Sequence, residues 1–214
     1  HDVRSPLVSQ LAMLHGLKTG RIEWHNNLID DIEQHAKRSL NLSDQFLQIT
    51  RAEQSAEQEF YEFDLTSAIE NSIDAQSHFA LSKQINIIFE EADSIWLSGN
   101  AELMERMITN LLSNAIKYSK PETTITITSN LMSGHAQLKI SDQGFGIDKT
   151  ELPYIFNRFR RQRHTEVNGE KGAGLGLNFV KVVVDKHKGT INTESELGHG
   201  TSFTINFPAL ENQS

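Results

Sequence analysis

The stretch Asp142-Gln143-Gly144-Phe145-Gly146-Ile147 follows a short apolar run that ends at Ile140 and has the pattern of a β-strand. Two glycines in such a turn allow a tight bend and a close approach of the main chain to a ligand. The carboxylate of Asp142 stands at the start of the turn, where it can accept a hydrogen bond from an amino group. Because Asp-x-Gly-x-Gly is common in turns, its neighbours along the chain must decide its meaning.

Downstream, Gly172-Ala173-Gly174-Leu175-Gly176-Leu177 opens an apolar helix predicted over 174–187. Backbone amides at a glycine-rich helix start favour anions. The glycine spacing is not that of a dinucleotide-binding fold, and no Gly-Lys-Ser or Gly-Lys-Thr of a P-loop is present. Between the two glycine motifs, a basic segment with paired phenylalanines (155–161) and a polar stretch to Lys171 predict either a mobile cationic lid or an ordinary surface loop.

Upstream, a helix is predicted over 101–118, with Asn110, Asn114 and Lys117 on one face because they are four and three residues apart. Amide oxygens can ligate Mg²⁺, and a lysine can pair with a phosphate. The alternative interpretation is a solvated helix face.

The composition limits the classes of function. The 214 residues include 20 Lys and Arg against 28 Asp and Glu, a net charge of −8 that argues against nucleic acid as the main partner. The absence of cysteine excludes disulfides and thiolate chemistry. No run of about 18 apolar residues predicts a membrane-spanning helix. The chain begins at His1 and not at Met, so we expect it to be part of a longer protein.

The first 60 residues predict a helical hairpin whose two apolar stripes need partners, and we expect two copies to form a four-helix bundle in a homodimer. Packing against the rest of the same chain is the alternative. A domain boundary near residue 60 divides domain 1–60 from domain 61–214. For the second domain the sequence predicts an α+β fold, in which helices cover one face of a sheet. The predicted helices are 64–82, 101–118 and 174–187, and the predicted strands are 85–89, 125–129, 137–140 and 202–207.

The order of these motifs, together with Gly198-His199-Gly200-Thr201-Ser202-Phe203, resembles the ATP-binding domain of sensor histidine kinases, within the GHKL superfamily of ATPases. The resemblance covers roughly residues 62–210 and matches the family's N, G1, F, G2 and G3 boxes. The start of the chain, from His1 to Leu7, resembles the family's phospho-acceptor box. The resemblance implies a helical hairpin followed by an α/β sandwich of GHKL type.

The resemblance also implies roles for individual residues. His1 would be the phosphoryl acceptor, Asp2 would orient it or accept its proton, and Arg158 or Arg160 would reach the γ-phosphate. Asn110 and Asn114 would hold Mg²⁺ and the phosphates of ATP. The other implied nucleotide-binding residues are Lys117, Tyr118, Asp142, Gly144, Gly146, Lys171, Gly172, Gly174, Leu175 and Gly176.

The implied function is ATP-dependent autophosphorylation on histidine and relay to an aspartate of a response-regulator receiver domain, in the cytoplasm. An anchor of the full-length protein in the inner membrane is left open by this resemblance. Ser5 stands where many relatives have Thr or Asn, which puts phosphatase activity in doubt, and Asn100 stands where Asp is common. The alternatives are a degenerate kinase acting as a scaffold, a phosphatase-dominated signalling module, or another GHKL ATPase.

Overall fold

The computed structural model describes residues 4–21, 26–54, 60–90, 94–160 and 174–210. They fall into two compact units, His1–Thr50 and Arg51–Ser214, each described here by itself. The division lies inside a helix, and the domain boundary proposed near residue 60 stays a prediction.

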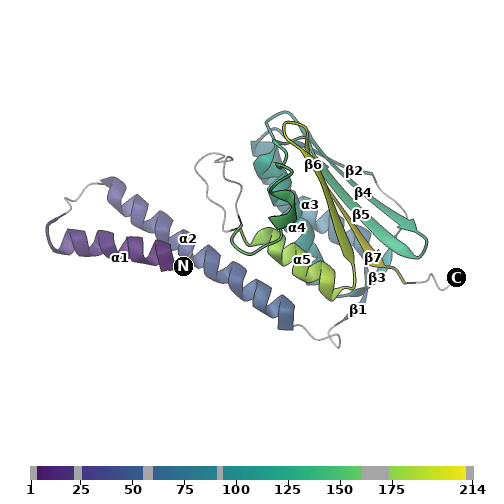
Figure 1. The fold of residues 1–214 in the computed structure, drawn as a ribbon, viewed down its shortest axis with the longest axis horizontal. Coiled ribbons are helices and arrows are strands. Elements are labelled where there is room, and N and C mark those ends of the chain that lie inside the picture. The colour runs from purple at the N-terminus through teal and green to yellow at the C-terminus, as the bar shows by residue number, and fades with distance from the viewer. Residues whose placement is uncertain (1–3, 22–25, 55–59, 91–93, 161–173, 211–214) are drawn as a thin grey trace. The chain divides into compact units, whose positions relative to one another are not determined.

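The elements follow one another in an α+β order (Figure 1). In chain order they are α1 (Arg4–Lys18), α2 (Asn26–Gln54), β1 (Tyr61–Asp64), α3 (Leu65–Ser82), β2 (Asn86–Glu90), β3 (Trp96–Gly99), α4 (Ala101–Tyr118), β4 (Thr124–Met132), β5 (His135–Asp142), the short 3₁₀ helix η2 (Leu152–Tyr154), α5 (Gly176–Lys186), β6 (Thr190–Glu196) and β7 (Gly200–Pro208).

In the first unit α1 and α2 form the predicted hairpin, and the Gln10 side-chain amide donates to the Ile32 carbonyl at 3.0 Å. Gly16 lies inside α1, whereas Gly20 has a φ of +67° after the end of that helix. Several large apolar side chains of the two helices are exposed: Leu7, Leu11, Leu14, Leu40 and Leu47. The predicted dimeric bundle remains a prediction.

The second unit is built on a sheet of five strands in the order β2-β4-β5-β7-β6. Strand β2 runs parallel to β4, and the other neighbours are antiparallel. One face of β4, β5 and β7 is buried, and α3, α4 and α5 lie over one side of the sheet (Figure 1). This arrangement confirms the predicted sheet with helices on one face.

Helices α3 and α4 begin within one residue of their predicted starts, whereas α5 begins at Gly176, two residues after its predicted start. Asp64 caps α3 by accepting from the Thr66 amide at 3.0 Å, and Asn100 caps α4 by accepting from the Leu103 amide at 3.1 Å. The cap at Asn100 shows that the amide can replace an aspartate here. Helix α4 buries a continuous apolar stripe from Met104 to Ile116 against the core, which leaves its polar face available for the site.

Candidate functional site

The carboxylate of Asp142 lies at the end of β5, opposite Thr201 of β7 in the sheet register. Its Oδ1 accepts from the Gly144 amide at 2.8 Å and from the Thr201 amide at 3.2 Å. Burial raises the pKa of Asp142, and the hydrogen bonds from Gly144 and Thr201 oppose that rise. The result is a half-buried carboxylate in a fixed orientation.

The glycines of the turn after β5 permit contacts that no side chain would allow. A β-carbon on Gly144 would lie 2.5 Å from the Tyr118 carbonyl, which accepts from the Phe145 amide at 3.0 Å. At Gly146 the φ is +70°, and a β-carbon would lie 2.0 Å from the Glu196 carbonyl. The turn is therefore packed between the end of α4 and the β6–β7 connection.

The polar face of α4 meets the start of α5 at Asn110. The Asn110 Nδ2 donates to the Arg106 carbonyl at 2.8 Å, so that its Oδ1 faces the other way. A β-carbon on Gly176 would lie 2.9 Å from this Oδ1. Asn114 and Lys117 follow on α4 at helical spacing, and the Lys117 ammonium stands 5.6 Å from the centre of the Tyr118 ring.

The Asn110 oxygen suits a hard cation such as Mg²⁺, which binds through few protein oxygens together with waters and phosphates. Among the described residues no cluster of three His, Cys, Asp or Glu side chains could hold a metal ion. A cation here would therefore depend on amide oxygens and a bound phosphate ligand.

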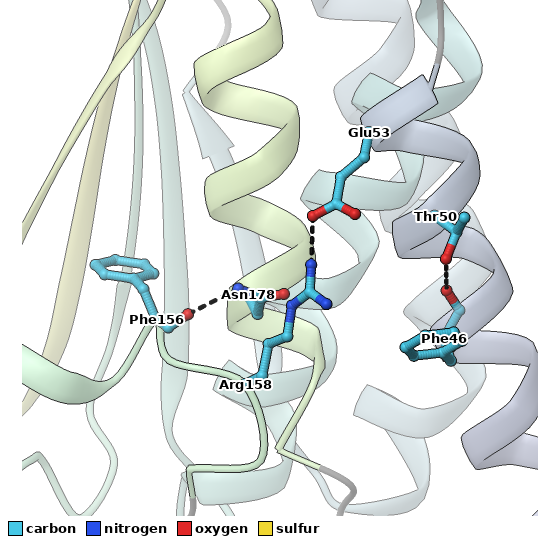
Figure 2. A network of polar contacts seen from close by, with 6 residues as sticks. All are labelled: Phe46, Thr50, Glu53, Phe156, Arg158 and Asn178. Carbon is cyan, nitrogen blue, oxygen red and sulfur yellow. Dashed lines mark hydrogen bonds and ion pairs between the residues drawn. The ribbon is translucent and has the colours of Figure 1, made fainter.

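The two arginines proposed for the γ-phosphate are both paired with carboxylates. Arg160 binds Glu151 at 2.9 and 3.1 Å and lies 5.3 Å from the centre of the Tyr154 ring. Arg158 forms an ion pair with Glu53, from the last turn of α2, inside the second unit (Figure 2). Each guanidinium therefore has a carboxylate partner and must leave it before it can bind a phosphate.

The segment that carries these arginines is tied to the start of α5. The Phe159 amide donates to the Gly174 carbonyl at 2.9 Å, and Gly174 has a φ of +70°. Leu175 is almost fully buried, so it is a packing residue. Phe156 packs edge-on against Phe203. The remaining predicted site residues, His1, Asp2, Lys171 and Gly172, lie outside the described residues.

Sequence reasoning missed three groups at this site. The Thr201 amide orients Asp142. Thr201 belongs to the Gly198–Phe203 motif, but only the register of β5 and β7 shows that its amide meets Asp142. Lys83 donates to the carbonyls of Ile116 and Lys117, both at 2.7 Å, and thereby caps α4; burial lowers its pKa. Asn178, in the first turn of α5, holds the Phe156 carbonyl at 3.0 Å.

No helix in the described part of the chain is both long and apolar enough to cross a membrane.

Residues 99–211 match the family model described as histidine kinase-, DNA gyrase B- and HSP90-like ATPase. The sensor histidine kinase RppB of Synechocystis sp. is 28% identical over 97% of this chain and 47% of its own length. The sensor protein RprX of Bacteroides fragilis is 42% identical over 50% of this chain and 21% of its own length.

Solved structures share the fold. The histidine kinase AdeS of Acinetobacter baumannii has a TM-score of 0.76 at 22% identity, covering 99% of this chain and 98% of that chain. The histidine kinase ThkA in complex with the response regulator protein TrrA has a TM-score of 0.71 at 20% identity, covering 100% of this chain and 60% of that chain. Full-length ShkA in complex with AMPPNP has a TM-score of 0.69 at 20% identity, covering 96% of this chain and 43% of that chain.

The chain thus spans less than half the length of these two curated relatives, and the family match covers the part that carries Asn110, Asp142 and Gly176. The chain belongs to the histidine kinase-, DNA gyrase B- and HSP90-like ATPase family, and within it to the sensor histidine kinases of two-component systems.

Proposed function

We propose that this chain binds ATP with Mg²⁺, transfers the γ-phosphoryl group to His1 and passes it on to an aspartate of a response-regulator receiver domain. The single observation that carries the proposal is the fixed carboxylate of Asp142 at the edge of the sheet. Its orientation by the Gly144 and Thr201 amides is what recognition of one amino group requires.

At the adenine end, the Gly144 and Thr201 amides both donate to Asp142 Oδ1, so we assign Oδ2 to the adenine amino group. The ionised carboxylate accepts at both oxygens and carries the negative charge that strengthens the bond, and Asp142 is ionised above its raised pKa. The Tyr118 ring, at the end of α4, is the group we expect to lie against the base. Gly144 and Gly146 keep this turn narrow enough to bring the carboxylate to the ligand.

At the phosphate end, the oxygens of Asn110 and Asn114 are proposed to hold Mg²⁺ and the phosphates, and Lys117 to neutralise phosphate charge. When bound, Mg²⁺ supplies positive charge to the phosphate oxygens. The amides at the start of α5 are proposed to bind the phosphates, because a helix N-terminus carries partial positive charge. Gly174 and Gly176 permit this close approach, and we extend the same role to Lys171 and Gly172.

Phosphoryl transfer needs an in-line nucleophile and neutralised charge more than it needs covalent help from the protein. The lone pair of a neutral His1 nitrogen attacks the γ-phosphorus, and the bond to the β,γ-bridging oxygen breaks to release ADP. The proton of the imidazole passes to Asp2 or to water. Arg158 or Arg160 stabilises the charge on the transferred group.

The partners are proposed from the same likeness. ThkA shares this fold and was solved with a response regulator, which supports a receiver domain as the partner here. The exposed leucines of α1 and α2 support a homodimer built on the hairpin. Replacing Leu11 and Leu40 by Glu is expected to give a monomer in light scattering, while a persistent dimer would place the interface elsewhere. The cytoplasmic location also remains a proposal.

The function is tested by incubating the protein with Mg²⁺ and γ-labelled ATP. Protein-bound label that survives alkali but not acid, and that is lost in His1→Gln, would establish phosphohistidine. If nucleotide binds and no label forms even in the full-length protein, the chain is a nucleotide-binding scaffold and the kinase proposal fails.

A further inference from the structure

The side chain of Asn178 connects α5 to the segment that carries Arg158. Its Nδ2 donates to the Phe156 carbonyl at 3.0 Å, across 22 residues of sequence (Figure 2). Three residues further along the segment, the Phe159 amide donates to the Gly174 carbonyl at 2.9 Å. Arg158 therefore lies between two points at which its backbone is tied to the start of α5.

The Phe156 bond fixes the orientation of the Asn178 amide. A carbonyl can only accept, so the amide nitrogen must face Phe156 and the oxygen must face away. That oxygen, Oδ1, is buried and has no hydrogen-bond partner among the described residues. Leaving a buried acceptor without a partner costs folding free energy, so its presence calls for a functional or structural reason.

Figure 2 shows that the Asn178 oxygen points to the side on which the Arg158 guanidinium lies. The guanidinium carries five N–H donors, and its Nη2 donates to the Glu53 carboxylate. The donor-rich guanidinium of Arg158 thus lies on the side toward which the unsatisfied Asn178 Oδ1 points. The ion pair with Glu53 is half-exposed on both partners, and solvent screening makes such pairs weak enough to exchange.

We propose that Asn178 is a positioning residue for Arg158: its Nδ2 holds the backbone, and its Oδ1 accepts from the guanidinium when Arg158 leaves Glu53 and turns toward the γ-phosphate. A neutral amide suits this task because it orients the guanidinium without cancelling its charge. Glu53, as a carboxylate, neutralises the same charge while it is bound. The inference rests on the proposed kinase function.

A double-mutant cycle in the full-length protein tests the proposal. Asn178→Ala is expected to lower the rate of histidine phosphorylation at saturating ATP about tenfold, with the nucleotide Kd changed less than twofold. In an Arg158→Met background the same substitution should have almost no further effect, because the group it positions is gone. Asn157→Ala, an exposed residue of the same segment, is the matched control and should leave the rate unchanged.

Asn178→Asp covers the case in which the alanine variant folds poorly, since it keeps the size of the side chain. It should also be slow, because it loses the bond to Phe156 and neutralises Arg158. An equal loss from Asn178→Ala with and without Arg158, or a wild-type rate in Asn178→Asp, would overturn the inference while leaving the kinase function intact. A wild-type protein that binds ATP but forms no phosphohistidine would overturn both.

Discussion

The α-carbon of Gly200 lies against the main-chain carbonyl of Asp142: a β-carbon built on Gly200 would stand 1.9 Å from that oxygen. The next residue, Thr201, donates its amide to the Asp142 carboxylate. The close approach at Gly200 therefore sets the position of a donor that orients the proposed adenine-binding group.

Substitution of Gly200 by alanine is expected to cost stability and nucleotide affinity together. The φ of +108° strains any side chain, and the overlap with Asp142 adds about 1–3 kcal/mol to the loss in the free energy of unfolding. Gly198→Ala is the matched control, because Gly198 has a φ of +83° but open space where the β-carbon would stand. It should lose only about 1–2 kcal/mol of backbone strain and keep its affinity. Urea unfolding and calorimetric titration with nucleotide measure both quantities.

Asp142→Asn is expected to fold and to lose nucleotide. The amide oxygen can still accept from Gly144 and Thr201, but an NH₂ group then faces the adenine amino group. Loss of a charge-assisted hydrogen bond of about 1.5–3 kcal/mol corresponds to roughly a 10–100-fold weaker Kd. Calorimetry with ATP measures the change, and an unaltered affinity would reject Asp142 as the adenine-binding residue.

Gly176→Ala is expected to change nucleotide affinity without lowering the stability of α5. Alanine in a helix is more stable than glycine by about 0.5–1 kcal/mol, so the melting temperature should hold or rise. The added β-carbon would stand 2.9 Å from Asn110 Oδ1 and push that amide aside. Affinity for Mg²⁺-nucleotide should fall several-fold in the same titration, and an unchanged Mg²⁺ dependence would show that Asn110 is not a ligand.

Glu53→Gln tests whether Glu53 withholds Arg158 from the nucleotide. Removing the carboxylate should raise the phosphorylation rate a few-fold and change the free energy of unfolding by less than about 1 kcal/mol, because the pair is half-exposed. Glu151→Gln, which removes the partner of Arg160, is the comparison. A rate that rises only with Glu151→Gln would assign the γ-phosphate to Arg160 instead.

The sequence was sufficient for the elements with strong periodicity. The helix predicted over 101–118 is α4 residue for residue, because its apolar stripe and its cap at Asn100 agree. Strands β1, β3 and β6 were not predicted. The first two are four residues long, and Ile191 is the one aliphatic side chain of the edge strand β6, so neither period nor composition stands out.

The site was predictable only in its local motifs. The glycine turn after β5 and the polar face of α4 each lie within a few consecutive residues. The pairing of Arg158 with Glu53 joins residues 105 apart, and the bond from Thr201 to Asp142 joins residues 59 apart. Such contacts depend on strand order and helix packing, which a single sequence does not specify. An asparagine within the apolar helix α5 was the one available signal for Asn178.

His187 joins three parts of the second unit in a buried position. The Asn100 amide donates to His187 Nε2 at 3.0 Å, so Nδ1 carries the proton and bonds to the Val183 carbonyl at 2.8 Å. The ring stacks on Phe60, with centres 4.9 Å apart. Burial lowers the pKa of His187, and the hydrogen bond to Val183 opposes that change. A second ring proton would set two N–H groups against each other at the cap of α4.

We therefore expect the second unit to lose stability in mild acid. The unfolded chain binds a proton at His187 near pH 6.5, while the folded chain does so only at lower pH, so the stabilisation is full above pH 6.5 and is lost as the pH falls through the folded pKa. Each unit of pKa depression corresponds to about 1.4 kcal/mol. Urea unfolding between pH 7.5 and 5 should show this slope, and His187→Gln should flatten it whatever its effect at pH 7.5. An equal slope in the wild-type protein and in His187→Gln would place the titrating group elsewhere.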